Sequence, residues 1–314
     1  DHRDLHSFPT RRSSDLIYWL LPCRECMQKI PAKDRFSHNT SSVSIAEDLL
    51  GEALHRFGLS PHRSKITRLS GGFMNASFLV CHEDQKLVFR IYSSPMQTAQ
   101  KEFDLLKHLA SGKVSVPEVF ACFQIGPRPV VVMEYLDGET LEDSILSGRC
   151  AGVSIYESIG RELAEIHKVR FEQAGFIGPG LKIDGAVENF SAFIGQFIER
   201  TLLDLESWPD KLDLKVNQRL RKLIRDKWHL VVDGETRPQL VHCDFNPKNI
   251  MVSKDPDPRV LGVIDWEFSD AGSGLIDFGN FFRFAYDYPK MAREAFTEGY
   301  RDRKSTRLNS SHLV

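Results

Sequence analysis

Two short segments of the sequence hold most of the residues whose types and spacing could do chemistry. The first, VHCDFNPKNIMV, contains His242, Asp244 and Asn249 in the order H-x-D-x-x-x-x-N. The second, VLGVIDWE, is an apolar stretch that delivers Asp265 at its end. Transfer of a γ-phosphoryl group needs a carboxylate to orient and deprotonate the acceptor hydroxyl, and oxygen ligands for the magnesium ion that neutralises the phosphates. Asp244, Asn249 and Asp265 supply these types of group.

Each of these residues also has a purely structural explanation. An Asp or Asn in a turn often only caps the backbone, and a His beside a strand is often a hydrogen-bonded core group. The Asn246-Pro247 step keeps the first segment from becoming helical early. The functional explanation gains its weight from the ordered set, in which the loop motif is followed by a strand ending in I-D-W-E.

The elements that must position these residues fall into a β-rich part followed by a helical part. Apolar residues at four-residue spacing predict a first helix over residues 43–58, ending near Gly58. Alternating and β-branched stretches, with one helical stretch among them, predict the rest of the first part: strands at 66–69, 76–81, 87–92, 118–122 and 130–134, and a helix at 98–109. After Tyr135 helical periodicity dominates, around residues 155–166, 190–198 and 220–228.

The turn between the first two predicted strands carries glycines. The segment LSGGFMNASF places Gly71 and Gly72 where backbone amides could approach the phosphates of a nucleotide. The segment is neither a Walker A loop nor G-x-G-x-x-G, and a Gly-Gly hairpin without function is a common finding. Because the segment precedes the two chemical segments in the sequence, a phosphate-binding turn remains the alternative to a hairpin without function.

At these residues the sequence resembles the aminoglycoside phosphotransferase and choline kinase-like family, over roughly residues 45–288. The resemblance implies an α+β, two-lobed protein kinase-like fold with a small antiparallel β-rich N-lobe and a larger, mainly helical C-lobe. It further implies that Asp244 is the catalytic base, that His242 braces the loop, and that Asn249 and Asp265 bind Mg²⁺. The sequence departs from the family at Cys243, where a Gly is usual, and at Lys248, where a second Gly is frequent.

The same resemblance implies an ATP site in the N-lobe. Arg90, in LVFRIY, stands where the family generally carries a Lys that contacts the α- and β-phosphates, and Glu102 is its candidate partner. Arg keeps the charge of Lys but not its compact ammonium geometry. The segment from Glu134 to Leu136 would form the hinge that reads the adenine edge. The implied cofactor-binding residues are therefore Gly71, Gly72, Asn75, Arg90, Glu102, Glu134 and Tyr135.

Two further residues invite a catalytic role that we do not assign. Asp277-Phe278-Gly279 spells the D-F-G triplet of protein kinases, but it follows GSGLI, whereas Asp265 ends an apolar strand, the context that a metal-binding Asp needs. We expect Asp277 to support the catalytic loop or to cap the next helix. His167, in LAEIHKV, is expected to be a packed structural group on a helix.

The composition bounds the partners. The 314 residues include 41 Lys and Arg against 43 Asp and Glu, giving a net charge of −2, and 41% are hydrophobic. A near-neutral chain has no general attraction to nucleic acid or anionic lipid. No apolar run approaches the roughly 20 residues that cross a bilayer, and six cysteines are too few for a disulfide scaffold. We expect a cytoplasmic protein with a small-molecule partner.

The two ends of the chain read differently from the rest. Residues 1–16, DHRDLHSFPTRRSSDL, and residues 302–312, DRKSTRLNSSH, resemble translated sequencing adapters. We therefore expect residues 1–26 and 302–314 to be non-native extensions, residues 43–135 to form the nucleotide-binding lobe, and residues 136–301 to form a truncated catalytic and acceptor-binding lobe. An exposed aromatic patch is expected in the last of these, formed by Phe278, Phe281, Phe282, Phe284 and Phe296.

These observations predict an ATP- and Mg²⁺-dependent small-molecule kinase. It would transfer the γ-phosphoryl group to a hydroxyl of an aminoglycoside, choline or a related metabolite, as a phosphotransferase with an alcohol group as acceptor. A protein kinase is the first alternative, against which stand the absent H-R-D and A-P-E segments. A nucleotide-binding pseudokinase is the second; Arg90 favours it, whereas intact Asp244, Asn249 and Asp265 argue against it.

Overall fold

The computed structural model describes residues 49–69, 75–149, 152–206, 214–233, 237–283, 285 and 288–305. The chain divides into two compact units, of which one contains residues 187–236 and the other contains residues 38–186 together with 237–314. The second unit contains all of the candidate site residues that the structure describes. The predicted lobe boundary at residues 135–136 lies within this unit and stays a prediction.

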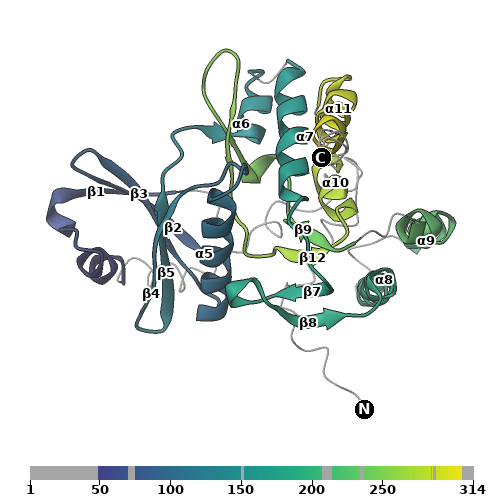
Figure 1. The fold of residues 1–314 in the computed structure, drawn as a ribbon, viewed down its shortest axis with the longest axis horizontal. Coiled ribbons are helices and arrows are strands. Elements are labelled where there is room, and N and C mark those ends of the chain that lie inside the picture. Colours follow the sequence, from purple (N-terminus) through teal and green to yellow (C-terminus); the bar gives the residue numbers. More distant parts are fainter. Residues whose placement is uncertain are drawn as a thin grey trace, which may run out of the picture. The chain divides into compact units, whose positions relative to one another are not determined.

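The N-terminal part of the second unit is an antiparallel sheet. A helix over residues 49–56 precedes it. The strands pair in the order β1-β2-β3-β5-β4, so that β5 lies between β3 and β4 although β4 precedes it in sequence. Their bounds are β1 (Ser64–Arg68), β2 (Ala76–His82), β3 (Gln85–Ile91), β4 (Val119–Ile125) and β5 (Arg128–Glu134). Helix α5 (Met96–Ala110) connects β3 to β4 and packs against β4 and β5 (Figure 1).

Alternation along these strands produces the packing. On β3, Leu87, Phe89 and Ile91 are buried while the residues between them are partly exposed. Val130 and Val132 of β5 join them in one apolar cluster with Leu54 of the first helix. Every strand predicted in this part is present, as is the helix now seen as α5. The predicted α+β class, with an antiparallel β-rich first part and a mainly helical second part, is confirmed.

The larger part of the second unit combines helices with two small sheets. The helices are α6 (Leu141–Leu146), α7 (Ser154–Ile166), α10 (Leu275–Phe282) and α11 (Ala292–Ser305). The 3-10 turns η2 (Pro179–Leu181) and η3 (Pro247–Asn249) also lie in this part, whereas η1 (Pro61–Arg63) precedes β1. One sheet has the order β11-β10-β6 and the other β8-β7-β12-β9. Their strands are β6 (Glu139–Thr140), β7 (Ala174–Ile177), β8 (Ile183–Val187), β9 (Gln239–Val241), β10 (Ile250–Val252), β11 (Val260–Val263) and β12 (Asp270–Gly272).

These strands hold the two chemical segments in place. The H-x-D-x-x-x-x-N segment fills the connection between β9 and β10, and Asp265 follows β11, which pairs antiparallel with β10. The first compact unit contributes α8 (Phe190–Glu206) and α9 (Leu214–Asp233), which contact each other. Among the described residues no helix is both long enough and apolar enough to cross a membrane.

The expected exposed aromatic patch is wrong for the residues that the structure describes. Phe281 and Phe296 are fully buried, and their rings stack with centroids 4.7 Å apart. Phe278 and Phe282 are partly buried against the same core cluster. Residues of α7, α10 and α11 form one core cluster around these rings, and Figure 1 shows the three helices side by side. The last aromatic in that expectation, Phe284, lies outside the described residues.

Helices α7 and α11 approach each other closely at two glycines. A Cβ placed on Gly160 would overlap the carbonyl oxygen of Phe296, and one placed on Gly299 would overlap that of Glu157. Neither obstacle is a flexible side-chain end, so the helices would have to move apart. We expect Gly160→Ala to lower the free energy of unfolding by about 1–3 kcal/mol, the usual cost of overpacking, as measured by urea denaturation.

A matched control separates this clash from the effect of adding a methyl group to any helix. Gly51 lies in the helix over residues 49–56, and no atom stands within 4 Å of the position its Cβ would take. Gly51→Ala is therefore expected to raise the free energy of unfolding by about 0.5–1 kcal/mol through helix propensity alone. Equal effects of the two substitutions would contradict the close approach of α7 and α11.

Candidate active site

The loop that carries the motif is held by one buried carboxylate. The backbone N–H of His242 donates to Oδ2 of Asp277, and the N–H of Cys243 donates to Oδ1, both at 2.9 Å. Nδ1 of His242 accepts from the N–H of Asp244 at 3.2 Å, and Nε2 donates to the carbonyl oxygen of Ile264 at 3.0 Å. His242 thus links the start of the loop to the segment that carries Asp265.

The backbone at Cys243 is left-handed, with φ at +63°. Its N–H and that of the preceding residue bind the two oxygens of the same carboxylate, and its carbonyl accepts from Nδ2 of Asn280 at 2.9 Å. A residue with a Cβ pays roughly 1–2 kcal/mol for this conformation. The site where the resembling family usually has Gly is therefore a site where the backbone conformation itself favours Gly.

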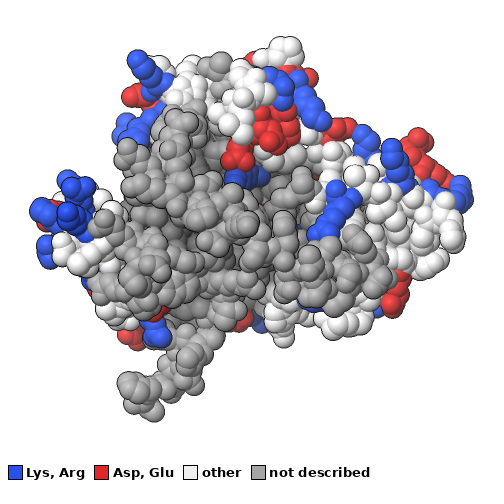
Figure 2. All heavy atoms as spheres, turned by 180° about the vertical axis from the view of Figure 1, so that it is seen from behind, with Lys and Arg blue, Asp and Glu red and all other residues white. Residues whose placement is uncertain are grey.

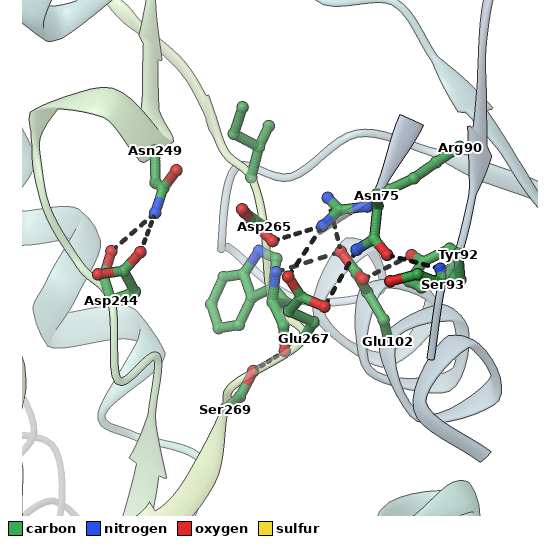
Figure 3. A network of polar contacts seen from close by, with 12 residues as sticks. Asn75, Arg90, Tyr92, Ser93, Glu102, Asp244, Asn249, Asp265, Glu267 and Ser269 are labelled. Carbon is green, nitrogen blue, oxygen red and sulfur yellow. Dashed lines mark hydrogen bonds and ion pairs between the residues drawn. The ribbon is translucent and has the colours of Figure 1, made fainter. Parts of the chain in front are cut away.

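Asp244 and Asn249 lie against each other. Nδ2 of Asn249 donates to the carbonyl oxygen and to Oδ2 of Asp244, both at 2.9 Å. The amide oxygen of Asn249 therefore points away from Asp244 (Figure 3). The turn η3 sets this geometry, because Asn246 caps it by accepting from the N–H of Lys248 and Pro247 occupies its first position.

Asp265 reaches the same place from β11. The N–H of Ile264 donates to the carbonyl oxygen of Asn249 at 2.9 Å, which joins the two segments immediately before Asp265. Asp265 itself has φ at +68°, a second left-handed residue that is not Gly. Such conformations cluster at functional sites because the surrounding structure must enforce them. Asp244 and Asn249 are thus in direct contact, and the hydrogen bond of Ile264 ties the backbone just before Asp265 to Asn249.

Arg90 is the centre of an ion cluster that contains residues of both the N-terminal sheet part and the larger part of this unit. Its guanidinium lies 2.6 Å from Asp265, 3.5 Å from Glu102 and 3.6 Å from Glu267 (Figure 3). Burial disfavours the charged form of Arg90, but the carboxylates, led by Asp265, hold its pKa well above the ordinary value. The predicted partner Glu102 is present, but the shortest contact is with the predicted metal ligand Asp265.

Glu102 is fixed by groups from both sides of the cluster. The hydroxyl of Tyr92 donates to its Oε2 at 2.5 Å, and the N–H of Trp266 donates to its Oε1 at 3.2 Å. Because Trp266 follows Asp265 directly, this bond holds the backbone beside the predicted metal ligand against α5. Lys101 adds a second tie, since its buried ammonium donates to the carbonyl oxygens of Glu267 and Ser269.

Glu267 was not singled out by the sequence. Its carboxylate accepts from Nδ2 of Asn75 at 3.0 Å, and Oδ1 of Asn75 accepts from the N–H of Ser93 at 3.2 Å. Burial, followed by the charge of Asp265, raises the pKa of Glu267 to about 7. The I-D-W-E motif contained the residue, but only the fold shows that it turns back toward Arg90.

Of the remaining predicted nucleotide-binding residues, the structure describes only the hinge residues Glu134 and Tyr135. Gly71 and Gly72 fall outside the described residues. Glu134 and Tyr135 follow β5, where the N–H of Glu134 donates to the carbonyl of Glu118 at 2.8 Å and the N–H of Tyr135 to that of Lys86 at 3.4 Å. Both hinge N–H groups named here are thus engaged with neighbouring backbone.

Asp277 and His167 have the structural positions expected for them. Asp277 lies on α10, is fully buried and accepts the two loop N–H groups described above. His167 is also fully buried; its Nε2 lies 3.0 Å from Asp277 and its Nδ1 lies 2.8 Å from the hydroxyl of Tyr300. Burial raises the pKa of Tyr300 to about 12, so its hydroxyl stays protonated at neutral pH.

A second cation lies beside the catalytic loop. Nη2 of Arg283, at the C-terminal end of α10, lies 3.7 Å from Oδ1 of Asp244. The side chain of Asp244 is 27% exposed and that of Arg283 is 16% exposed. No motif marked Arg283, because its proximity to Asp244 depends on how α10 packs under the loop.

The donor set suits a hard cation bound in part by other oxygens. Within the described ranges no three His, Cys, Asp or Glu side chains are grouped to hold a metal ion. Asn249 and Asp265 offer one amide oxygen and one carboxylate, and Mg²⁺ is typically held by one or two protein groups together with phosphates and water.

On the face drawn in Figure 2, basic and acidic side chains of the described residues are interspersed.

Comparison with known families and structures identifies the family and the fold. A family model described as the phosphotransferase enzyme family matches residues 65–308. The fold is similar to the crystal structure of a thermostable mutant of aminoglycoside phosphotransferase APH(4)-Ia in ternary complex with ADP and hygromycin B, with a TM-score of 0.58 and 18% identity over 82% of this chain and 92% of that one. It is also similar to the gentamicin complex of APH(2")-IIa, with a TM-score of 0.53 and 18% identity over 83% of this chain and 85% of that one.

Curated relatives carry a different name. The chain is 24% identical over 274 residues to "Probable acyl-CoA dehydrogenase IBR3" of Arabidopsis thaliana, which covers 81% of this chain and 31% of that protein. It is also 24% identical over 265 residues to acyl-CoA dehydrogenase family member 11 of Homo sapiens, covering 81% of this chain and 32% of the relative. The chain thus spans about a third of the length of the curated relatives it matches.

Proposed function

Because this chain belongs to the phosphotransferase enzyme family, we propose that it transfers the γ-phosphoryl group of ATP to a hydroxyl of a small molecule, with Mg²⁺ as the metal. The enzyme class predicted from the sequence, a phosphotransferase with an alcohol group as acceptor, is confirmed by that membership. The nucleotide, the metal and the acceptor are the parts that we propose here.

One observation carries the proposal: Asp244, Asn249 and Asp265 converge from two segments. The amide of Asn249 binds Asp244, and the carbonyl of Asn249 accepts from the residue before Asp265. A turn with a purely structural role would not need to be joined to the segment that carries Asp265. It would also not need left-handed backbone at Cys243 and Asp265, a conformation that clusters at functional sites. A base, an amide oxygen and a second carboxylate placed in this way are the groups that phosphoryl transfer requires.

The chain's own residues divide the work as follows. The carboxylate of Asp244 would accept a hydrogen bond from the acceptor hydroxyl and take its proton. Asn249 would orient that carboxylate through its amide N–H and turn its oxygen, with Asp265, toward Mg²⁺. The metal ion, when bound, neutralises charge on the phosphates. His242 would keep the loop closed against the Asp265 segment.

In the N-lobe, Arg90 would contact a phosphate while Glu102 holds its guanidinium. Asn75 would keep Glu267 beside Arg90. Gly71 and Gly72, which lie outside the described residues, would offer their backbone amides to the phosphates. Backbone groups of the hinge over Glu134 to Leu136, other than the engaged N–H groups of Glu134 and Tyr135, would receive the adenine. In this proposal residues 43–135 form the nucleotide-binding lobe, residues 136–301 form the catalytic lobe, and the protein works in the cytoplasm.

Two classes of acceptor follow from the comparisons. The solved structures named above are complexes with hygromycin B and gentamicin, so an aminoglycoside or another small alcohol such as choline is the first class. The relatives named acyl-CoA dehydrogenases make a hydroxyl-bearing acyl-CoA the second. The chain is near neutral overall, with charges of both signs exposed, which favours neither nucleic acid nor a membrane as partner.

The proposal is tested with γ-labelled ATP, MgCl2 and a panel containing aminoglycosides, choline, hydroxy acids and hydroxyacyl-CoAs. We expect label to move to at least one acceptor and the transfer to stop when EDTA removes the metal. Nucleotide binding without transfer to any member would instead favour the pseudokinase. Transfer to a protein substrate alone would favour the protein kinase.

A prediction concerns Arg90, which the structure places between three carboxylates. If it also contacts phosphate, Arg90→Ala should weaken the binding of Mg-ATP about tenfold or more, because a hydrogen bond to a charged group contributes roughly 1.5–3 kcal/mol. Arg90→Lys should retain or improve the affinity, since an ammonium can serve as a point-charge phosphate binder. Isothermal titration calorimetry measures both, and unchanged affinity in Arg90→Ala would show that the side chain serves only the ion cluster.

A further inference from the structure

The two oxygens of Asp244 face different neighbours. Oδ2 accepts from the amide of Asn249 at 2.9 Å, on the side of the loop joined to Asp265. Oδ1 lies 3.7 Å from Nη2 of Arg283, at the end of α10. The Asn249 side is the one that the proposed function gives to the metal and the nucleotide. Arg283 and Asn249 thus contact different oxygens of the base.

Arg283 is held there by its place in the fold. It caps the C-terminus of α10, where its N–H donates to the carbonyl of Gly279 at 3.1 Å, and a cation at a helix C-terminus is favoured by the helix dipole. Helix α10 is itself fixed to the catalytic loop, because Asp277 and Asn280 bind the backbone on either side of Cys243. The guanidinium thus keeps its position relative to the base.

A cation at this point has a consequence for the acceptor. The guanidinium of Arg283 partly neutralises the negative charge of Asp244. The base therefore attracts an acceptor's ammonium group, placed next to the reacting hydroxyl, less strongly than an unpaired carboxylate would. A guanidinium has five N–H donors in a planar fork and can bind a carboxylate while it also pairs with a second anion. The side chain is 16% exposed, which leaves it within reach of a small molecule at the base.

We propose that Arg283 is a specificity residue, and that the acceptor carries a carboxylate within a few bonds of the hydroxyl that receives the phosphoryl group. This inference rests on the proposed function and, among the acceptors in its test panel, names the hydroxy acids as the substrate class in preference to the cationic aminoglycosides and choline. Arg283 would bind the carboxylate and thereby place the neighbouring hydroxyl against Asp244. A cationic acceptor would be repelled at the same point.

The experiment compares three probes of similar size on the Mg-ADP-loaded protein by isothermal titration calorimetry. 3-Hydroxybutyrate carries the carboxylate, 1,3-butanediol has the same skeleton without it, and choline carries a cation. Wild type should bind 3-hydroxybutyrate about tenfold or more tightly than 1,3-butanediol, the effect of one charge-assisted hydrogen bond. Choline should bind more weakly than both.

Variants decide whether Arg283 causes this preference. Arg283→Gln should abolish the preference for the carboxylate, and Arg283→Lys should keep part of it. The matched control is Arg293→Gln, because Arg293 is an exposed Arg on the neighbouring helix that lies over the ring of Phe282. This control should leave the preference at its wild-type value. A merely structural role of Arg283 would change the affinities for both neutral and anionic probes by the same factor.

Three results would overturn the inference: no binding of 3-hydroxybutyrate to wild type, equal affinities for the carboxylate and the diol, or a preference that survives in Arg283→Gln. The binding of Mg-ADP, measured first and compared with and without EDTA, separates this failure from failure of the proposed function. Loss of metal-dependent nucleotide binding would contradict the proposed function, whereas intact nucleotide binding with the wrong acceptor preference would contradict only the role of Arg283.

Discussion

Asp244→Asn is expected to reduce phosphoryl transfer by about 10²–10⁴-fold, the usual cost of losing a general base, while Mg-ATP still binds. The amide has nearly the same shape as the carboxylate, so the loop geometry set by His242 and Asp277 should persist. It cannot accept the hydroxyl proton. Single-turnover assays with labelled ATP measure the transfer, and calorimetry measures the nucleotide affinity.

The control for this substitution is Asp255→Asn. Asp255 is an exposed loop residue whose ion pair with Arg259 spans 3.6 Å, and surface pairs of this kind contribute little. Transfer in the control should equal that of the unmodified chain. If Asp244→Asn turned over within about tenfold of wild type, the base would have to be another group.

The second large effect separates Asp265 from the D-F-G sequence at Asp277. Asp265 is 32% exposed and follows Ile264, whose N–H binds the carbonyl oxygen of Asn249, whereas Asp277 is fully buried and accepts from two backbone N–H groups of the loop. We expect Asp265→Ala to lose metal-dependent nucleotide binding in a folded protein. Asp277→Ala should mainly destabilise the fold, by about 3–5 kcal/mol, because it leaves buried partners without their carboxylate.

Magnesium titrations against bound nucleotide, with urea denaturation of each variant, distinguish the two residues. Asp277→Asn serves as the milder variant, since an amide oxygen can still accept one of the two loop N–H groups. The assignment would be reversed if only the Asp277 variants lost their metal dependence while Asp265→Ala kept it.

Much of the fold follows from local patterns. Alternation on β3 and the apolar run of β5 predict the strands of the N-terminal sheet, because one buried face requires a period of two. The insertion of β5 between β3 and β4 depends on pairings across α5, which no local pattern encodes. The sheet β8-β7-β12-β9 was not predicted, since its strands have three to five residues and too little periodicity to recognise.

The candidate site divides in the same way. His242, Asp244 and Asn249 lie within eight residues, so their spacing alone could indicate that they act together. The contact of Arg90 with Asp265 joins residues 175 positions apart, and the bond from Asn75 to Glu267 joins residues 192 apart. Such contacts arise only when the β-rich and helical parts pack, which is why Glu267, Lys101 and Arg283 were missed.

The carboxylate of Asp277 also affects how this loop fluctuates. Loop amides normally exchange their hydrogens with solvent through small local openings, at little cost in free energy. The amides of His242 and Cys243 instead donate to a carboxylate with no exposed surface, and that carboxylate contacts His167, which binds Tyr300 on α11. Their hydrogens can be released only when α10 separates from the loop. These two loop amides should therefore exchange as slowly as those of core strands, and the chemistry at Asp244 would take place on a backbone as rigid as the protein interior.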